Sequence, residues 1–243
     1  MMRLDKLLSH AGWGSRKQVR ELIRKGRVQV NGQTVRKDDL HVDELQDQVT
    51  VEDKQVSAPK EIVLMLHKPA GVVSAIRDDR YPTVMDCVGT LPGSLFPVGR
   101  LDRDTTGLLL ITNNGALAHD LLAPKKHVEK TYEVILKKDW DPRWQTAIEQ
   151  GLTIDQGEVC RSAHVCQKDT RKILLTLHEG KYHQVKRMML ACDNEVAQLK
   201  RIRFGPLMLD ETLAPGQWRF CSEAEIRALK QGRSQEERQK RIA

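Results

Sequence analysis

The sequence predicts an α+β protein in which a small helical N-terminal module precedes a larger domain with a mixed or antiparallel sheet. Residues 1–51 carry two short amphipathic helix patterns and a tight hairpin signal. Residues 61–230 carry short β-rich runs with a few helical stretches between them, without the regular strand–helix–strand order of a parallel sheet. A chain of 243 residues has room for one such domain and a small appendage.

The elements of the N-terminal module follow from local patterns. Apolar residues recur at the i, i+3, i+4 and i+7 positions over residues 4–11, which is typical of one face of a helix. Ser15 and Gln18 then have the spacing of a capping box, so a second helix is expected over residues 15–25. Beyond it, apolar and polar residues alternate around Asn31-Gly32, the strongest short signal of a two-residue β-hairpin.

The larger domain is bounded by two polar segments. We interpret residues 52–60 as a linker and residues 231–243 as a basic, disordered tail. Between them, apolar and β-branched runs predict strands at residues 62–66, 72–74, 108–112, 132–136, 173–177 and 207–209. Helical patterns predict helices at residues 115–122, 141–150, 183–191 and 223–230.

Composition argues against membrane, exported and disulfide-stabilised proteins. No apolar run approaches the ~18 residues needed to cross a bilayer. Asp5 and Lys6 interrupt the first apolar segment, so no secretory signal is expected either. The five cysteines are odd in number and form no C-x-x-C pair. We therefore expect a cytoplasmic protein with free thiols, no disulfide and no metal site.

The charge of the chain is concentrated at its start. The formal net charge is +7, and residues 1–37 hold ten Lys or Arg against two acidic residues. The second helix presents most of these cations on its outer face: Arg16, Lys17, Arg20, Arg24 and Lys25. A run of this kind is often only a solvated helix face. Its confinement to one compact module favours a polyanionic partner, RNA or DNA.

The most informative stretch for chemistry is residues 99–107, Gly-Arg-Leu-Asp-Arg-Asp-Thr-Thr-Gly, directly before a buried strand. Asp102 lies between Arg100 and Arg103, which should keep its carboxylate ionised and fixed in position. Such a carboxylate can act as a nucleophile, a base or a metal ligand. The alternative is an aspartate that only stabilises a turn.

Two other enzyme classes fit this loop less well. The string from Asp102 to Thr106 matches the D-x-D-x-T pattern of some Mg²⁺-dependent phosphatases, but these need further carboxylates downstream, and two arginines would repel the ion. Asp102 and Asp104 could also be the carboxylate pair of a glycosidase. Sugar sites are usually rich in aromatic residues, whereas this chain is only 4% aromatic.

Two further stretches carry residues suited to binding a nucleotide. Residues 179–190 predict a turn that leads into a helix whose first turns contain Lys186 and Arg187, which could capture a phosphate or a carboxylate. Tyr132 begins a predicted strand, where its ring could stack on a nucleobase. Taken singly, each has an ordinary alternative: an amphipathic helix with Val185 inward, and a tyrosine packed in the core.

Together these stretches resemble the ribosomal RNA pseudouridine synthase family, over roughly residues 2–230. The strings GRLDRDTTGLLLITNNG, EKTYEV and EGKYHQVKRMM carry the resemblance, and the last of them is similar to the branch that modifies small-subunit (16S) rRNA. The N-terminal module resembles the αL RNA-binding module of ribosomal proteins. The resemblance implies isomerisation of a specific uridine to pseudouridine in rRNA without any cofactor or metal.

It also implies roles for individual residues. Asp102 matches the family's nucleophile, Tyr132 the residue that stacks on the target base, and Lys186 the cation that pairs with the aspartate. The substrate-binding residues it implies are Arg100, which would extrude the target nucleotide or hold a phosphate, Val185, which would line the pocket, and Lys68 and Arg187, which would contact the RNA backbone. The cationic helix would bind phosphates without reading sequence.

The expected partner is rRNA within a small-subunit assembly intermediate, and the protein is expected to act as a monomer. Two alternatives stay open. One is a non-catalytic RNA-binding or ribosome assembly factor that uses the same basic surfaces, and the other is a synthase that acts on 23S rRNA.

Overall fold

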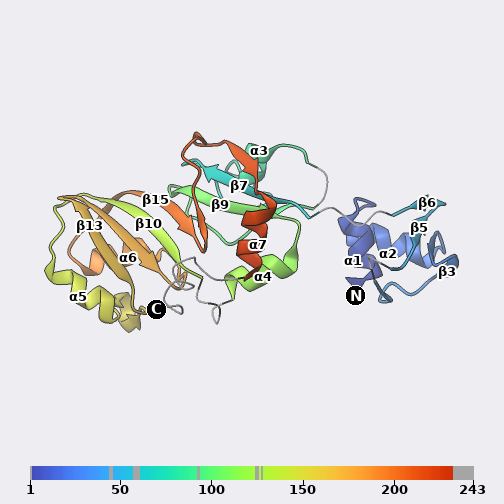
Figure 1. The fold of residues 1–243 in the computed structure, drawn as a ribbon, viewed down its shortest axis with the longest axis horizontal. Coiled ribbons are helices and arrows are strands. Elements are labelled where there is room, and N and C mark those ends of the chain that lie inside the picture. The colour runs from blue at the N-terminus through green and yellow to red at the C-terminus, as the bar shows by residue number, and fades with distance from the viewer. Residues whose placement is uncertain are drawn as a thin grey trace. The chain divides into compact units, whose positions relative to one another are not determined.

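The computed structural model describes residues 2–43, 46–56, 61–91, 94–123, 126 and 128–231. The chain divides into two compact units (Figure 1): an N-terminal unit of Met1–Ile62 with Thr90–Leu95, and a larger unit of Val63–Gly89 with Phe96–Ala243. Among the described residues, no helix is both long enough and apolar enough to span a membrane. Residues 57–60 of the predicted linker and residues 232–243 of the predicted tail lie outside the described part.

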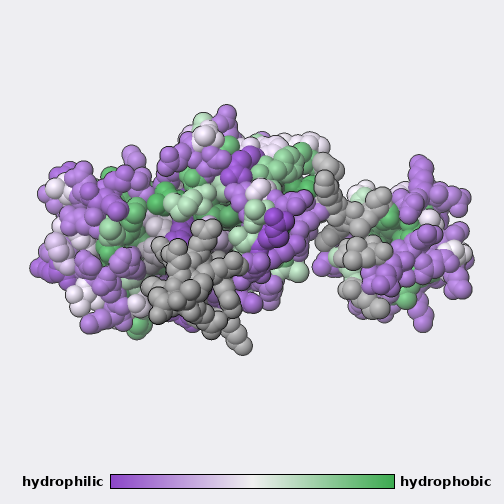
Figure 2. Space-filling model, in the orientation of Figure 1, coloured by the Kyte–Doolittle hydropathy of each residue, from purple (hydrophilic) through white to green (hydrophobic). Residues whose placement is uncertain are grey.

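The described residues of the N-terminal unit form two helices and two small sheets. The helices are α1 (Leu4–His10) and α2 (Arg16–Arg24). One sheet pairs β1 (Met2–Arg3) with β4 (His41–Val42), and the other has the order β3 (Gln33–Val35), β2 (Val28–Val30), β5 (Val49–Val51), β6 (Lys54–Gln55). Apolar residues of both helices and of the strands form one core. Figure 2 shows hydrophilic residues over most of the visible face of this unit.

Both local signals in this unit are confirmed. The Ser15 hydroxyl accepts a hydrogen bond from the backbone N–H of Gln18, and the Gln18 side chain accepts one from the backbone N–H of Ser15. Asn31 and Gly32 have φ values of 51° and 78°. These left-handed conformations are those of the type I′ turn that joins β2 to β3.

The linker prediction is wrong for residues 52–56. Glu52 and Asp53 have φ values of 48° and 64° and turn the chain back, so that β6 pairs with β5. Val56 is buried in the core of the N-terminal unit. The stretch has the polar composition of a linker, but one buried valine and a two-residue turn are enough to add a strand to the sheet.

The larger unit contains a nine-stranded mixed sheet, which confirms the predicted fold class. Its order is β13 (His164–Asp169), β14 (Lys172–Leu177), β10 (Lys130–Leu136), β15 (Val196–Phe204), β9 (Thr106–Thr112), β7 (Val63–Lys68), β17 (Trp218–Phe220). Strand β8 (Phe96–Pro97) pairs with β9, and β16 (Leu207–Met208) with β15. The strand pairing is antiparallel except between β15 and β9, which run parallel.

Helices support both halves of this sheet. The helices are α3 (Val84–Val88), α4 (Gly115–Leu122), α5 (Arg143–Gln150), α6 (Gln184–Ala191) and α7 (Glu223–Gln231). Helices α4 and α7 contact each other and pack on β7 and β9, where apolar residues of all four elements form a core (Figure 1). Helix α5 contacts β13, and α6 contacts β15 and β11 (Thr153–Ile154), which pairs with β12 (Glu158–Val159).

The strand prediction is incomplete in this unit, since the predicted strands do not include β8, β11, β12, β13, β15 or β17. The central strand β15 is missing from the prediction because its sequence, Val-Ala-Gln-Leu-Lys-Arg-Ile-Arg-Phe, carries three cations and no long apolar run. The strand predicted at residues 72–74 is reduced to an isolated bridge between Val73 and Thr83. Gln231, assigned to the tail by the sequence, is the last residue of α7.

The contact between β9 and β15 requires a glycine. Gly107, at the start of β9, lies opposite Arg201 in the parallel register and has a φ of +104°. A Cβ atom at this position would lie 2.2 Å from the carbonyl oxygen of Arg201 and 2.6 Å from its nitrogen. Since both are backbone atoms of a central strand, they cannot move aside without displacing the sheet.

We expect Gly107→Ala to destabilise the larger unit by more than about 3 kcal/mol, because it combines a backbone clash with an unfavourable φ. Chemical denaturation measures this free energy of unfolding. Gly115→Ala, at the first residue of α4, is the matched control: no atom lies within 4 Å of the added methyl group, and alanine suits a helix. Equal stabilities of the two variants would contradict the proposed constraint.

Candidate active site

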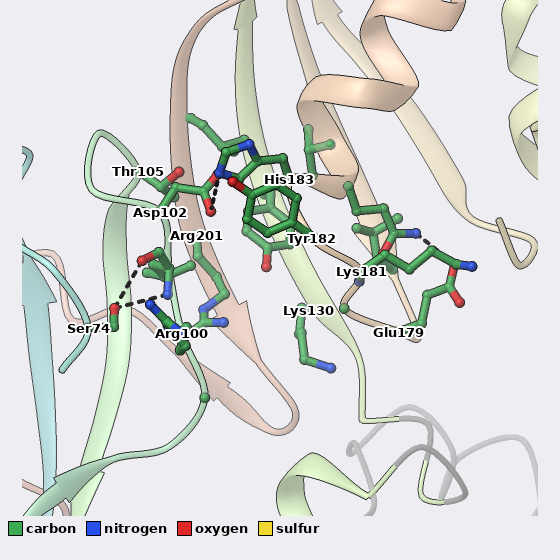
Figure 3. Close-up of a pocket in the computed structure, with 18 of the residues that line it drawn as sticks. Ser74, Arg100, Asp102, Thr105, Lys130, Glu179, Lys181, Tyr182, His183 and Arg201 are labelled. Atoms are coloured by element: carbon green, nitrogen blue, oxygen red, sulfur yellow. Dashed lines mark hydrogen bonds and ion pairs between the residues drawn. The ribbon is translucent and has the colours of Figure 1, made fainter. Parts of the chain in front are cut away.

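A pocket of about 540 Å³ in the larger unit joins the three stretches that the sequence singles out. Its walls come from the loop before β9, from β10 and β15, and from the turn that leads into α6. Of the predicted site residues, Arg100, Asp102, Tyr132 and Val185 line it. Figure 3 shows Asp102 and His183 pointing toward one another at one end of this pocket.

Asp102 lies in the loop before β9 and faces two nitrogen atoms. Its side chain is 26% exposed, and its Oδ2 lies 3.2 Å from the Nζ of Lys186. Its Oδ1 lies 3.6 Å from the Nε2 of His183. The expected ion pair between Asp102 and Lys186 is therefore present.

The arginines next to Asp102 in the sequence do not provide this charge. The guanidinium of Arg103 lies over the ring of Tyr81, 4.3 Å from its centroid, and Arg100 is exposed at the pocket wall. Within the described part of the chain, neither arginine forms an ion pair with Asp102. Neighbouring side chains of this loop point in different directions. The cationic partner of Asp102 is Lys186, on a helix that lies more than 80 residues further along the sequence.

Lys186 is shared between two carboxylates. Its Nζ also lies 2.6 Å and 2.9 Å from the two oxygens of Asp104. Burial alone would lower the pKa of Lys186, but its hydrogen bonds to Asp104 and Asp102 outweigh burial and raise the pKa above its ordinary value. Burial would raise the pKa of Asp104, yet the hydrogen bond from Lys186 outweighs it and lowers that pKa. The cation beside Asp102 therefore stays protonated at neutral pH.

The turn before α6 adds two residues that the sequence analysis leaves unassigned. His183 has a left-handed backbone with a φ of 47°, and this conformation turns its ring toward Asp102. Tyr182 stacks on the His183 ring with 3.8 Å between centroids and is 77% exposed. No local sequence signal marks a left-handed histidine, so the contact with Asp102 could not be predicted.

Tyr132 and Arg201 face each other across the β10–β15 pair. They are direct partners in the antiparallel register, and Tyr132 is almost fully buried at the pocket wall. Arg201 is 2% exposed, and its Nε donates to the carbonyl oxygen of Leu108 at 2.8 Å. Burial lowers the pKa of Arg201, and the neighbouring Tyr132 offsets part of this effect. Arg201 is not among the predicted site residues, because strand β15, on which it lies, is not among the predicted strands.

Lys68 does not contact RNA as predicted. Its side chain is fully buried, and its Nζ donates to the carbonyl oxygens of Pro69, Arg103 and Thr105 at 3.0, 3.2 and 2.8 Å. Burial lowers its pKa to about 8. Two of these carbonyls belong to the loop that carries Asp102, so Lys68 holds that loop in place.

Arg187, for which an RNA contact is expected, is held by two carboxylates of the protein. Its guanidinium donates to Asp155 and Glu158 at 2.6 Å each. These hydrogen bonds raise the pKa of Arg187 above its ordinary value. Arg187 therefore ties α6 to the segment around β12, and two carboxylates already neutralise the charge that the sequence analysis assigns to RNA.

Of the five cations predicted to bind RNA from the second helix, three are paired with carboxylates. Arg20 donates to Asp5, which is fully buried, Arg24 pairs with Asp38, and Lys25 pairs with Glu21. Burial would raise the pKa of Asp5, but hydrogen bonds from Arg3 and Arg20 outweigh burial and lower it. The remaining two cations, Arg16 and Lys17, are exposed and form no ion pair with any described residue.

The described residues around Asp102 are poorly suited to binding a metal ion. No cluster of three or more His, Cys, Asp or Glu side chains that could hold a metal ion occurs among the described residues. The two aspartates of the phosphatase pattern share Lys186, whose ammonium group would repel a divalent ion. The site instead combines the Asp102 carboxylate, the Lys186 ammonium group beside it and Tyr132 at a pocket wide enough for a nucleotide.

Comparison with known proteins agrees with this arrangement. The RNA pseudouridylate synthase family matches residues 62–191, which include the Asp102 loop, Tyr132 and Lys186. The chain belongs to the RNA pseudouridine synthase family. An S4 domain matches residues 2–49 of this synthase, in the N-terminal unit.

Relatives of this synthase cover nearly the whole chain. An uncharacterized RNA pseudouridine synthase of Bacillus subtilis is 44% identical over 94% of this chain and 98% of its own. Ribosomal small subunit pseudouridine synthase A of Pseudomonas aeruginosa is 40% identical (93% and 99%), and ribosomal large subunit pseudouridine synthase B of Bacillus subtilis is 36% identical (95% and 96%). A crystal structure of a pseudouridylate synthase superposes with a TM-score of 0.68 at 35% identity, covering 94% of this chain and 100% of that one.

For the synthase we expect Lys68→Met to lower kcat by about 10- to 100-fold, because the loop that carries Asp102 loses its anchor. RNA affinity and its dependence on salt should stay unchanged, since Lys68 touches no solvent. Steady-state kinetics and RNA binding at several salt concentrations, below the unfolding temperature, provide both readouts. A shallower salt dependence, by about 0.7 to 0.9 in the log–log slope, would instead indicate a direct phosphate contact.

Proposed function

We propose that this synthase converts one specific uridine of 16S rRNA to pseudouridine, with Asp102 as the nucleophile. The observation that carries the proposal is the ion pair of Asp102 with Lys186, at the wall of a pocket that Tyr132 also lines. The small-subunit target is supported by the string Tyr-His-Gln-Val-Lys-Arg-Met and by the small-subunit relative. The large-subunit relative makes 23S rRNA the competing target.

The proposed reaction needs little from the protein besides placement. The N1–C1′ bond of the target uridine breaks, uracil rotates, a C5–C1′ bond forms, and the proton at C5 is replaced by one at N1. No electron or group is transferred to another molecule, so no cofactor is required. The uridine must leave its stack to reach Asp102, which a pocket of nucleotide size permits.

Each residue of the pocket has a proposed part in this sequence. Asp102 forms a transient bond to the nucleotide, and Lys186, 3.2 Å away, holds its carboxylate in position. Tyr132 supports the detached uracil from below and assists removal of the C5 proton. Val185 supplies an apolar wall, which limits the access of water to the bond exchange.

The N-terminal unit supplies RNA affinity in this proposal. Arg16 and Lys17 bind backbone phosphates, since the other cations of α2 are paired with carboxylates. Contacts to phosphates carry no sequence information, so we propose that the shape of rRNA in a partly assembled small subunit selects the site. We propose that the enzyme works in the cytoplasm as a monomer. Its family membership sets aside a purely non-catalytic RNA-binding factor.

Cells that lack the protein and are complemented with variants test the assignment of Asp102. Asp102→Asn should yield no pseudouridine at the target, whereas Asp104→Asn should retain activity within about tenfold, since Asp104 is 70% exposed and only shares Lys186. Pseudouridine mapping in 16S and 23S rRNA provides the readout. Activity of Asp102→Asn would disprove the mechanism. A target in 23S rRNA would overturn only the choice of subunit.

A paired substitution in α2 tests the role of the N-terminal unit. Replacing Arg16 and Lys17 with Gln should reduce the log–log salt slope of RNA binding by roughly 1.5, because two phosphate contacts are lost. The matched control replaces Arg24 and Lys25 with Gln, which removes the same charge from residues already paired. Identical slopes for the two double variants would show that α2 does not bind RNA in this way.

A further inference from the structure

Three cations gather at the end of the pocket away from the Asp102 carboxylate. Figure 3 shows the side chains of Arg100, Lys130 and Arg201 on one side, and Asp102, Tyr182 and His183 on the other. They come from three separate elements: the loop before β9, the first residue of β10, and the middle of β15. Like charges repel in a low-dielectric pocket, so this arrangement is unfavourable unless a negative group joins it.

Two other cations near the pocket have carboxylate partners, and Arg103 lies over the ring of Tyr81. Lys181 pairs with Glu158, and Lys186 pairs with Asp102 and Asp104. Within the described part of the chain, Arg100, Lys130 and Arg201 form no such pair. The ring of Phe204, 5.6 Å from the Nζ of Lys130 and 4.9 Å from the Cζ of Arg201, offers these two cations a π face, but no described carboxylate balances the three charges.

Glu179 is the carboxylate whose field reaches Lys130, but it is engaged elsewhere. It accepts hydrogen bonds from the backbone N–H of Arg161 at 2.9 Å and from Nε2 of Gln184 at 2.7 Å. Burial, and then the charge of Arg201, lower the pKa of Lys130 to about 8, and Glu179 offsets only part of this effect. An anion in the pocket would offset both effects, because it would stabilise the protonated amine of Lys130.

Hydrogen-bond donors are also left over at this end of the pocket. The Nη2 of Arg201 is buried without an acceptor, although its Nε is held by Leu108. The Nζ of Lys130 donates to the carbonyl oxygen of Val128 at 2.9 Å, which uses one of its three N–H groups. Donors of this kind are normally satisfied in a complete site.

We propose that Arg100, Lys130 and Arg201 form a subsite for a backbone phosphate of the RNA strand beside the flipped-out uridine. The inference rests on the proposed function, since a uridine at Asp102 brings a phosphate on each side of its ribose. Arg100 and Lys130 contact the phosphate oxygens, and the buried Arg201 supplies a fixed positive charge behind them. Holding this phosphate sets the position of the ribose relative to Asp102.

Single substitutions measured by RNA binding test the subsite. The RNA is rRNA isolated from cells that lack the protein, and the protein is the full chain carrying Asp102→Asn, so that binding is read without turnover. Lys130→Gln and Arg100→Gln should each weaken binding by about tenfold and reduce the log–log salt slope by about 0.7 to 1. Lys168→Gln, on the exposed strand β13 and outside the pocket, is the matched control and should change neither value.

The outcomes separate the subsite from the proposed reaction. Slopes equal to that of the parent protein, or an equal loss in Lys168→Gln, would overturn the phosphate subsite. The subsite would also be overturned if Lys130→Gln, in a chain with Asp102 intact, lowered kcat but left the salt slope of RNA binding unchanged. That result would indicate that Lys130 only positions other groups. If isomerisation does not depend on Asp102, the proposed reaction is refuted. The salt slopes of RNA binding would still test the phosphate subsite. Arg201→Lys, which keeps the charge, should retain most of the binding.

Discussion

The parallel contact between β9 and β15 brings the chemistry of this synthase together. At Gly107 the two backbones approach closer than any side chain would allow, directly after the loop that carries Asp102. Because β15 also pairs with β10, the same contact places Tyr132 and Arg201 beside that loop. Helix α6 packs near β15 and adds Lys186 and His183. The position of each group relative to Asp102 depends on this one approach of two strands.

The parts of the fold that could be predicted are those that short stretches of sequence determine. A capping box marks α2, an Asn-Gly turn marks the β2–β3 hairpin, and a clear apolar pattern gives the bounds of α4. Strand β6 could not be predicted because it consists of Lys54 and Gln55 alone, and β15 because cations interrupt its apolar residues. The partners of β15, strands β9 and β10, lie far from it in the sequence, so no local pattern identifies them.

The site shows the same division. Arg100, Asp102 and Tyr132, which lie in the motifs before β9 and on β10, line one pocket. The family resemblance implies RNA contacts for Lys68 and Arg187, and the charge pattern of the second helix suggests one for Arg20, whereas each is held by carbonyl or carboxylate groups of the protein. A sequence does not distinguish a cation that is free from one that is paired with a carboxylate of the protein. Only the fold identifies which carboxylates lie within reach.

The anchoring of the Asp102 loop has a consequence for how such enzymes diverge. Lys68 grips carbonyl oxygens, which every amino acid possesses, rather than particular side chains. Mutations at the exposed position 103 can therefore accumulate without weakening this contact. A lineage of such enzymes can thus change the exposed residues of the loop toward new RNA targets while the carboxylate of Asp102 keeps its position. Target choice and catalysis can then evolve separately.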